Sequence, residues 1–153
     1  NNNLNIKENY QWIYKSEKDG LRKVQLSEDN WNLIDSDGNL ILKENIYDIY
    51  GLEKDGLRRI KLSENQYNLI DGNGNLTLKK NYNYIGNIEE NELRIVQLSD
   101  NKWNLIDNNG NLILKDNYYY IYGCYKNGDR YVDGKLFNYK KLKLIKELIK
   151  WNL

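Results

Sequence analysis

The chain of 153 residues contains no histidine, no proline and no methionine, and it has a single cysteine, Cys124. Without histidine, and with one thiol, it lacks the residue types that most zinc sites and most His-based catalytic sites need. We therefore expect no metal, no cofactor and no catalytic residue. One cysteine permits no disulfide within the chain, and we interpret it as a structural thiol. The chain starts with Asn1 rather than methionine, which is typical of a fragment or a processed product.

The chain also lacks an excess of charge of one sign. Lys and Arg together number 23 and Asp and Glu 22, so the net charge is +1. Such a chain has no field that would steer it to nucleic acid, and we expect no nucleic-acid partner. No run approaches the roughly 18 consecutive apolar residues of a membrane-spanning helix. The hydrophobic fraction of 40% excludes general disorder.

What the sequence has in abundance is a repeat. A ten-residue phrase reading aromatic-Asn-Leu-Ile-Asp-x-Asp/Asn-Gly-Asn-Leu starts at Trp31, Tyr67 and Trp103, and 67 − 31 and 103 − 67 both equal 36. A constant period of this length predicts a tandem-repeat protein. Extended outward, it divides residues 1–139 into a half repeat (5–20), three repeats (21–56, 57–92 and 93–128) and a partial repeat (129–139). The phrase also fixes an aspartate and a glycine in each copy: Asp35, Gly38, Asp71, Gly74, Asp107 and Gly110.

Within a unit we expect four short antiparallel strands, at 21–26, 31–35, 40–43 and 46–50 in the first. Turn residues every 8–12 positions, with β-branched and aromatic runs between them, indicate an all-β meander. Adjacent apolar pairs, such as Leu33 and Ile34, predict strands covered on both faces, so neighbouring units must stack. An open β-solenoid-like array and a small closed β-propeller both satisfy this requirement, and we favour the open array. The apolar spacing in residues 140–153 predicts a C-terminal amphipathic helix that caps the last repeat.

The repeated stretch resembles the WG-repeat (KWG-repeat) family. Trp31 and Trp103 match the family tryptophan, Tyr67 replaces it in the middle copy, and the Ile-Asp pairs and turn glycines also match. The chain departs from the family pattern at Asn32, Asn68 and Asn104, where asparagine replaces the glycine that follows the family tryptophan. The resemblance covers roughly residues 5–139. It implies a bacterial or viral repeat module without established chemistry.

The turn that begins at Asp35 has alternate carboxylates and is similar to the start of a calcium loop. A full loop of that kind needs a glutamate at its twelfth position, where this chain has Ile46. We therefore prefer a plain hairpin turn. The arginines at the start of the first strand of each unit predict a salt-bridge ladder rather than an anion-binding stripe: Arg22, Arg58, Arg94 and Arg130.

Tyrosines in the fourth strand become more frequent along the chain. They cannot all point inward in a strand of period 2, so part of them is exposed. Exposed tyrosine suits contacts with proteins or stacking on sugars. The candidate binding residues are Tyr84, Tyr118, Tyr119, Tyr120 and Tyr122. We expect a non-enzymatic module for protein–protein interaction, a scaffold within a larger protein or assembly; the alternative is a carbohydrate-binding module, and the least favoured is a carboxylate-based hydrolase.

Overall fold

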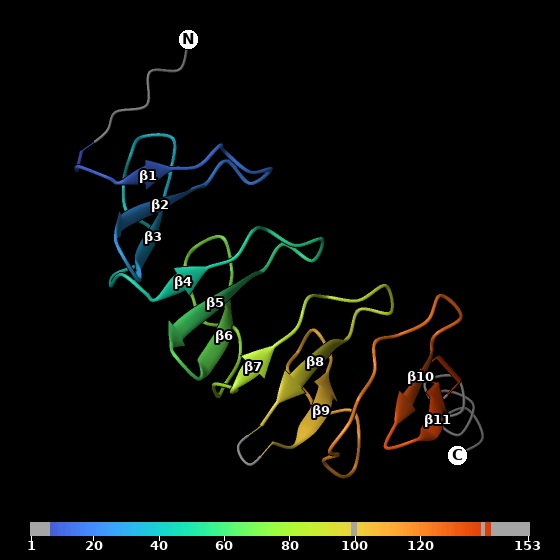
Figure 1. Cartoon of the computed structure of the whole chain (residues 1–153). Helices are drawn as coiled ribbons and strands as arrows, with labels where there is room; N and C mark the ends of the chain where they lie inside the picture. The colour runs from blue at the N-terminus through green and yellow to red at the C-terminus, as the bar shows by residue number, and fades with distance from the viewer. Residues whose placement is uncertain (1–6, 99–100, 139, 142–153) are drawn as a thin grey trace. The chain divides into compact units, whose positions relative to one another are not determined.

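A computed structural model describes residues 7–98, 101–138 and 140–141 of the chain (Figure 1). The strands are β1 (Trp12–Ile13), β2 (Arg22–Ser27), β3 (Asn30–Ile34), β4 (Asp48–Ile49), β5 (Arg58–Ser63), β6 (Gln66–Ile70), β7 (Tyr84–Ile85), β8 (Arg94–Gln97), β9 (Trp103–Ile106), β10 (Asp129–Val132) and β11 (Lys135–Asn138). They pair as small antiparallel sheets, so the predicted all-β class is confirmed. The chain divides into two compact units, residues 1–85 and 86–153.

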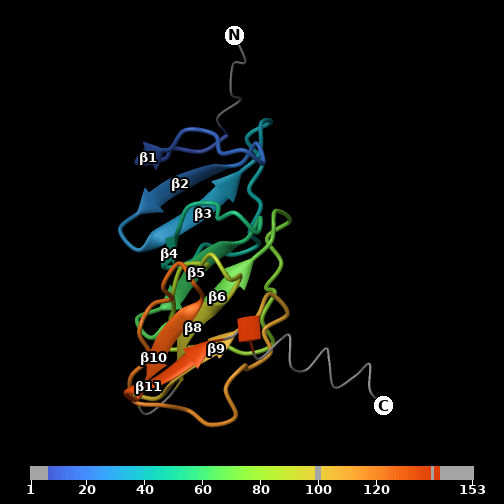
Figure 2. The ribbon, with the colours of Figure 1, turned by 90° about the vertical axis from the view of Figure 1, so that its right-hand side faces the viewer.

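The first unit contains two three-stranded sheets of the same design, β1-β2-β3 and β4-β5-β6, which follow one another in Figures 1 and 2. Arg22 lies opposite Ile34 in the first sheet, and Arg58 lies opposite Ile70 in the second. The second unit contains the pair β8-β9 and the hairpin β10-β11. In β8-β9 the register is the same, since Arg94 lies opposite Ile106. Equal sequence thus gives equal strand register at intervals of 36 residues.

The third predicted strand of each unit is wrong. Residues 40–43 form only an isolated bridge, between Leu40 and Ile34, and the fourth strand is reduced to a bridge at Ile46 and the two residues of β4. The physical reason is Asn32, whose side chain is fully buried. Its Oδ1 accepts hydrogen bonds from the backbone N–H groups of Leu33 (2.7 Å) and Leu42 (3.0 Å). A side chain here takes over bonds that a strand ladder would otherwise make.

The amide nitrogen of Asn32 completes this arrangement. Its Nδ2 donates to the Leu42 carbonyl (3.1 Å) and to Asn45 Oδ1 (2.8 Å). Asn68 and Asn104 repeat these contacts at the same spacings. The asparagine that departs from the WG pattern therefore ties its strand to the segment that follows.

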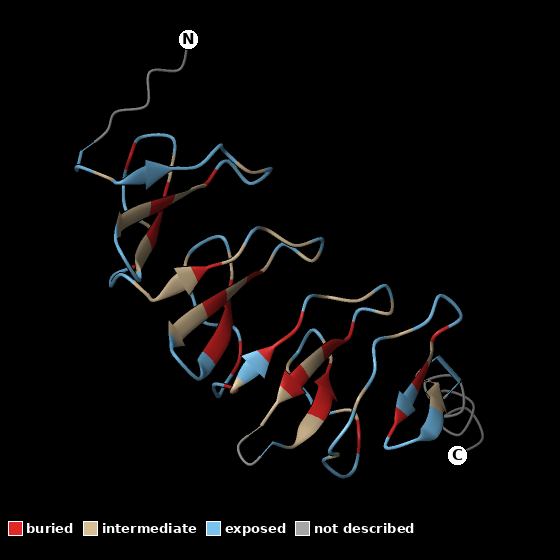
Figure 3. Cartoon of the chain, in the orientation of Figure 1, coloured by how far each residue is buried: buried red, intermediate tan, exposed pale blue. Residues whose placement is uncertain are grey.

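Both faces of the inner strands are covered, as the adjacent apolar pairs predict. Leu33 and Ile34 are both fully buried, and Leu33 shares one core cluster with Ile49 and Ile60 of the next sheet. Figure 3 shows this burial concentrated on the strands that lie within each sheet. The expectation of coverage on both sides was wrong for the segment 40–42, because Leu40 stays exposed while Leu42 is buried.

The turn at Asp35 is a hairpin turn closed by its own side chains. Asp35 Oδ1 accepts the backbone N–H groups of Asp37 (2.9 Å) and Asn39 (2.8 Å), and Oδ2 accepts Asn39 Nδ2 (2.9 Å). These bonds, the one from the Asn39 side chain first, hold the pKa of Asp35 below its ordinary value. Gly38 supplies the positive φ of 79° that the turn needs. The carboxylate therefore shapes the loop.

The predicted helix at 140–153 lies, apart from Lys140 and Lys141, outside the described residues. Within the described part of the chain, no helix is long and apolar enough to cross a membrane.

Candidate functional site

A row of exposed apolar side chains crosses the last sheet of the second unit, and we call it the terminal row: Tyr122, Tyr131 and Leu136. The backbone N–H of Tyr122 donates to the Tyr131 carbonyl (3.0 Å), and Tyr131 lies opposite Leu136 in the β10-β11 hairpin. Their exposed fractions are 59%, 42% and 61%. Neighbours opposite one another on antiparallel strands share a face, so the three side chains form one continuous surface.

The opposite face of this sheet is part of the core. Val132 is buried and bridges to Ile121, and Phe137 packs on the cluster that also contains Leu93 and Leu105. Ile121 is partly buried and Val132 is buried, and because side chains alternate along a strand, Tyr122 and Tyr131 point outward. The hairpin is therefore anchored on one side and presents the terminal row on the other.

In the first unit, the row of side chains that corresponds to the terminal row lies against the next sheet. There the corresponding row is Tyr14, Lys23 and Leu33: Tyr14 N–H donates to the Lys23 carbonyl (2.9 Å), and Lys23 lies opposite Leu33. Leu33, the counterpart of Leu136, is fully buried in the core cluster. The exposed face of β10-β11 thus corresponds to a face that packs against a neighbouring sheet in the first unit.

The middle residue of the row is cationic in the first two sheets and apolar in the last two. Lys23 occupies it in the first sheet and places its Nζ 4.7 Å from the Tyr14 ring centre and 4.4 Å from that of Trp31. In the second sheet it is Arg59, which lies 4.5 Å from the Tyr50 ring and pairs with Glu53. At the same place β10 has Tyr131. The terminal row is apolar where the two sheets of the first unit have a cation, and β8 has the apolar Ile95 at the same place.

Next to the terminal row, Trp103 and residues 119–122 line a hollow of about 300 Å³. The Nζ of Lys102 lies 3.3 Å from the centre of the Tyr119 ring, a close cation–π contact. Asp133 accepts the backbone N–H of Tyr120 at 2.7 Å, which fixes this turn. Tyr119 and Tyr120 both remain exposed. Rings held in place beside a cation and a carboxylate can contact a flat ligand.

The candidate tyrosines do not all lie together. Tyr119, Tyr120 and Tyr122 line one hollow, whereas Tyr118 is partly buried and packs on the core of the second unit. Tyr84 lies in β7 of the first unit, with its ring edge-on to Tyr67 at 5.7 Å. Sequence reasoning missed Tyr131 and Leu136, because the repeat breaks after Gly134. The sequence signal that could have found Tyr131 is the period, which places it three repeats after Lys23.

The aromatic residue that starts each phrase has a structural role. Tyr67 is buried between Tyr50, at 6.4 Å, and Tyr84. Burial, followed by a hydrogen bond with Tyr67, raises the pKa of Tyr50 to about 12. Trp31 and Trp103 each exchange two backbone hydrogen bonds, with Ile46 and Tyr118 respectively. These residues thus join neighbouring segments, Tyr67 through its ring and Trp31 and Trp103 through their backbone.

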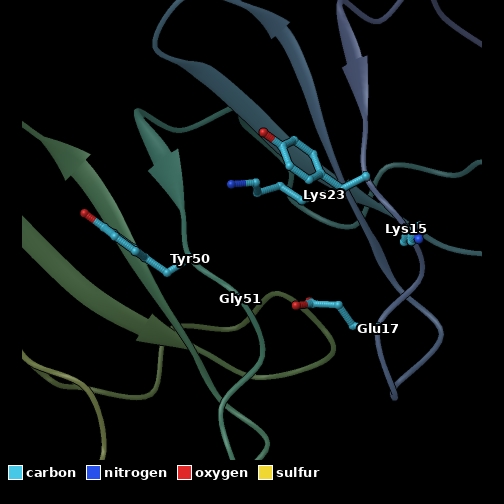
Figure 4. A pocket seen from close by; sticks show the side chains of 6 residues that line it. Lys15, Glu17, Lys23, Tyr50 and Gly51 are labelled. Atoms are coloured by element: carbon cyan, nitrogen blue, oxygen red, sulfur yellow. The ribbon is translucent and has the colours of Figure 1, made fainter.

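A second hollow lies in the first unit, lined by Tyr14, Lys15, Glu17, Lys23, Tyr50 and Gly51, with a volume of about 510 Å³ (Figure 4). Its one carboxylate, that of Glu17, already has hydrogen-bond partners. Glu17 Oε1 accepts the backbone N–H of Leu52 (2.8 Å), and Oε2 binds Arg58. Glu17 is therefore committed to joining the two sheets of this unit, and the hollow has no free acid for catalysis.

Salt bridges of the predicted kind are present at Arg58 and Arg130. Arg58, which is fully buried, binds Glu17 and Asp19, and Arg130 binds Glu89. The Nε atom of Arg130 is buried without a hydrogen-bond partner.

Cys124 is half-buried. Its sulfur accepts a hydrogen bond from Asn91 Nδ2 (3.4 Å) and donates to the Tyr125 carbonyl (3.3 Å). Among the described residues no cluster of side chains could hold a metal ion.

Comparison with known proteins gives little. No protein-family model matches the chain, and no curated protein matches it. Among solved structures, the crystal structure of the computationally designed Ika4 protein is similar, with a TM-score of 0.45 and 13% sequence identity. That match covers 86% of this chain and 90% of the designed one. A likeness at this level carries no argument about function.

Proposed function

We propose that the chain is a non-enzymatic protein-interaction module and that the terminal row is its docking face. The observation that carries the proposal is the exposure of Tyr122, Tyr131 and Leu136, while Leu33 at the counterpart position in the first sheet is fully buried by the sheet that follows. Exposed apolar side chains that form one continuous surface mark interaction sites. The tyrosines add a polar hydroxyl, as is common in protein interfaces.

The partner that fits this face is a β-sheet with an aliphatic surface. The first unit supplies the example, because Leu33 is covered there by Ile49, Ile60 and Ile70. The chain itself we propose to be an open β-solenoid-like array of 36-residue units related to the WG repeats. The packing of one sheet face on the next within residues 1–85 supports the array. A catalytic role for repeated carboxylates is disfavoured, since Arg58 neutralises Glu17 and Asp19.

The test compares two lysine variants of exposed tyrosines. Proteins captured on the chain are purified, and their dissociation constants are measured by calorimetry with wild type, Tyr131→Lys and Tyr84→Lys. Lys23 occupies the position of Tyr131 in the first sheet, so the fold accepts lysine there. We expect Tyr131→Lys to weaken binding at least about tenfold, because it removes an aromatic ring from the docking face and puts a cation against an aliphatic partner surface, and Tyr84→Lys to have no effect. Equal dissociation constants for wild type and Tyr131→Lys would refute the proposal.

The hollow beside Tyr119 favours a second candidate, a carbohydrate-binding module. Its rings and the adjacent cation and carboxylate suit stacking on a sugar and bonding to its hydroxyls. A glycan array probes this directly. A glycan signal that Tyr119→Ala and Tyr120→Ala abolish and Tyr131→Lys leaves intact would favour the glycan module over the protein-interaction module. An array without signal eliminates the candidate.

A further inference from the structure

Four arginines occupy one position in successive sheets, at the start of the strand that leads each hairpin. Arg22, Arg58 and Arg94 lie opposite isoleucines, and Arg130 lies opposite Phe137. Three of them are buried: Arg58, Arg94 and Arg130. Arg22 is only half-buried. A buried arginine needs carboxylates that compensate the loss of water, so the four positions can be compared by what pairs with each.

Arg58 shows the complete arrangement. Its Nε and Nη2 donate to Glu17 Oε2 at 2.9 and 2.5 Å, and its Nη1 and Nη2 donate to the two oxygens of Asp19 at 2.6 and 2.9 Å. Both acids stand in the hairpin before β2, at Glu-x-Asp spacing and followed by Gly20. The planar guanidinium thus receives two carboxylates from one turn of the preceding sheet, the bidentate geometry that arginine favours.

Arg22 makes the same backbone contact as Arg94 and Arg130 but lacks these acids. Its Nη1 donates to the carbonyl of Tyr14, eight residues earlier, at 3.5 Å. Arg94 and Arg130 make the same contact, at 3.4 Å to Gly86 and at 3.3 Å to Tyr122. The guanidinium of Arg22 is therefore oriented as in the paired positions. Within residues 7–98, 101–138 and 140–141, no carboxylate forms an ion pair with it.

We propose that Arg22 is the receptor for an acidic hairpin of a partner protein, a turn that carries Glu-x-Asp-Gly like the one from Glu17 to Gly20. The inference rests on the proposed function, protein interaction, and names a second surface for it. The chain's own hairpins do not supply the acids. Glu17 and Asp19 are bound by Arg58, and Glu89 by Arg130.

The remaining hairpins of the chain point to the same conclusion. Glu53 pairs with Arg59 in the second sheet. In the last hairpin the repeat positions of Glu17 and Asp19 are occupied by Tyr125 and Asn127, which have no carboxylate. Head-to-tail addition of a second copy would therefore leave the Arg22 guanidinium without charge compensation. An acidic turn from a different protein satisfies it.

The test uses a cyclic peptide with the sequence Ser-Glu-Lys-Asp-Gly-Leu, closed by flanking cysteines so that it keeps a hairpin. Its binding to the full chain is followed by the side-chain Nε–H signal of Arg22 in an NMR titration. We expect this signal to shift and saturate. Arg22→Gln should weaken binding at least about tenfold, Arg22→Lys by less, and Lys15→Gln, which removes an exposed charge nearby, not at all.

Three results would overturn the proposal. The first is equal binding of a neutral peptide with glutamine and asparagine in place of the acids. The second is unchanged affinity in Arg22→Gln. The third is dimerisation of the chain alone, lost in Arg22→Gln, because the occupant would then be a second copy. These three results do not depend on the Tyr131→Lys measurement. Failure of the Arg22 proposal is therefore distinguishable from failure of the proposal that the terminal row is a docking face.

Discussion

The buried asparagine of each repeat gives the sharpest test of how the sheets are held together. Asn68 is 1% exposed. Its Oδ1 accepts the Leu78 backbone N–H at 3.2 Å, and its Nδ2 donates to the Leu78 carbonyl at 3.3 Å and to Asn81 Oδ1 at 2.8 Å. Replacement with alanine removes both partners of the Leu78 peptide groups at once.

Each buried polar group left without a partner costs about 1–3 kcal/mol. Two such groups at Leu78 give an expected loss of about 2–6 kcal/mol for Asn68→Ala, toward the lower value where water enters the space left by the amide. Asn73→Ala is the matched control. Its side chain is exposed in the turn, so the loss there should stay below about 0.5 kcal/mol.

The assay is urea unfolding at 25 °C, followed by circular dichroism, with the slope of free energy against urea compared between variants. An unchanged slope with a lower midpoint identifies a true loss of stability. If Asn68→Ala and Asn73→Ala unfold at the same midpoint, the side chain does not anchor the segment after β6, and the explanation given for the missing third strand fails.

Three further variants test the ion pairs and the turn by the same urea assay. Arg58→Gln should lower the free energy of unfolding by about 3 kcal/mol, because it leaves two carboxylates facing a buried amide. Arg22→Gln should lower it by less than about 1 kcal/mol, and equal losses would contradict the pairing. The hydrogen bond from Arg58 lowers the pKa of Asp19 in the folded chain. The ionised Asp19 therefore stabilises the fold fully above its unfolded pKa of about 3.9, and this stabilisation is lost as pH falls through the folded pKa. If the free energy of unfolding of Asp19→Asn depends on acid pH as that of the wild type does, this reasoning is refuted. Gly74→Ala should lose about 1–3 kcal/mol, since φ is +79° and a Cβ would lie 2.9 Å from Leu42, whereas Gly72→Ala, with open space, should be near neutral.

Much of the local structure follows from the sequence because the repeat specifies it three times. The hairpins at Asp35 and its copies need residues that accept positive φ and bond their own backbone, and these stand at fixed positions. Burial of both Leu33 and Ile34 follows from their adjacency in a strand. The third strand was mispredicted because a run such as Leu40-Ile41-Leu42 satisfies strand propensity, while the competing bonds come from Asn32, ten positions away from Leu42.

The exposed surface follows from the sequence only in part, for a related reason. The exposure of the tyrosines at 119, 120 and 122 was predicted because a strand of period 2 cannot bury them all. Tyr131 stands three periods after Lys23, but Leu136 belongs to a partial repeat whose hairpin is shorter, so its counterpart Leu33 becomes evident only from strand register. The pairing of Arg58 with Glu17 and Asp19 spans about one period, which the sequence pattern predicts as a ladder but does not assign to particular acids.

The most direct test of the docking face is hydroxyl-radical footprinting of the chain, free and bound to a purified captured partner. The interaction proposal predicts protection of Tyr122, Tyr131 and Leu136 on binding, and unchanged oxidation of Tyr84, whose exposed fraction of 39% is close to that of Tyr131. A bound complex in which the three residues of the terminal row are oxidised as fast as in the free chain would contradict it.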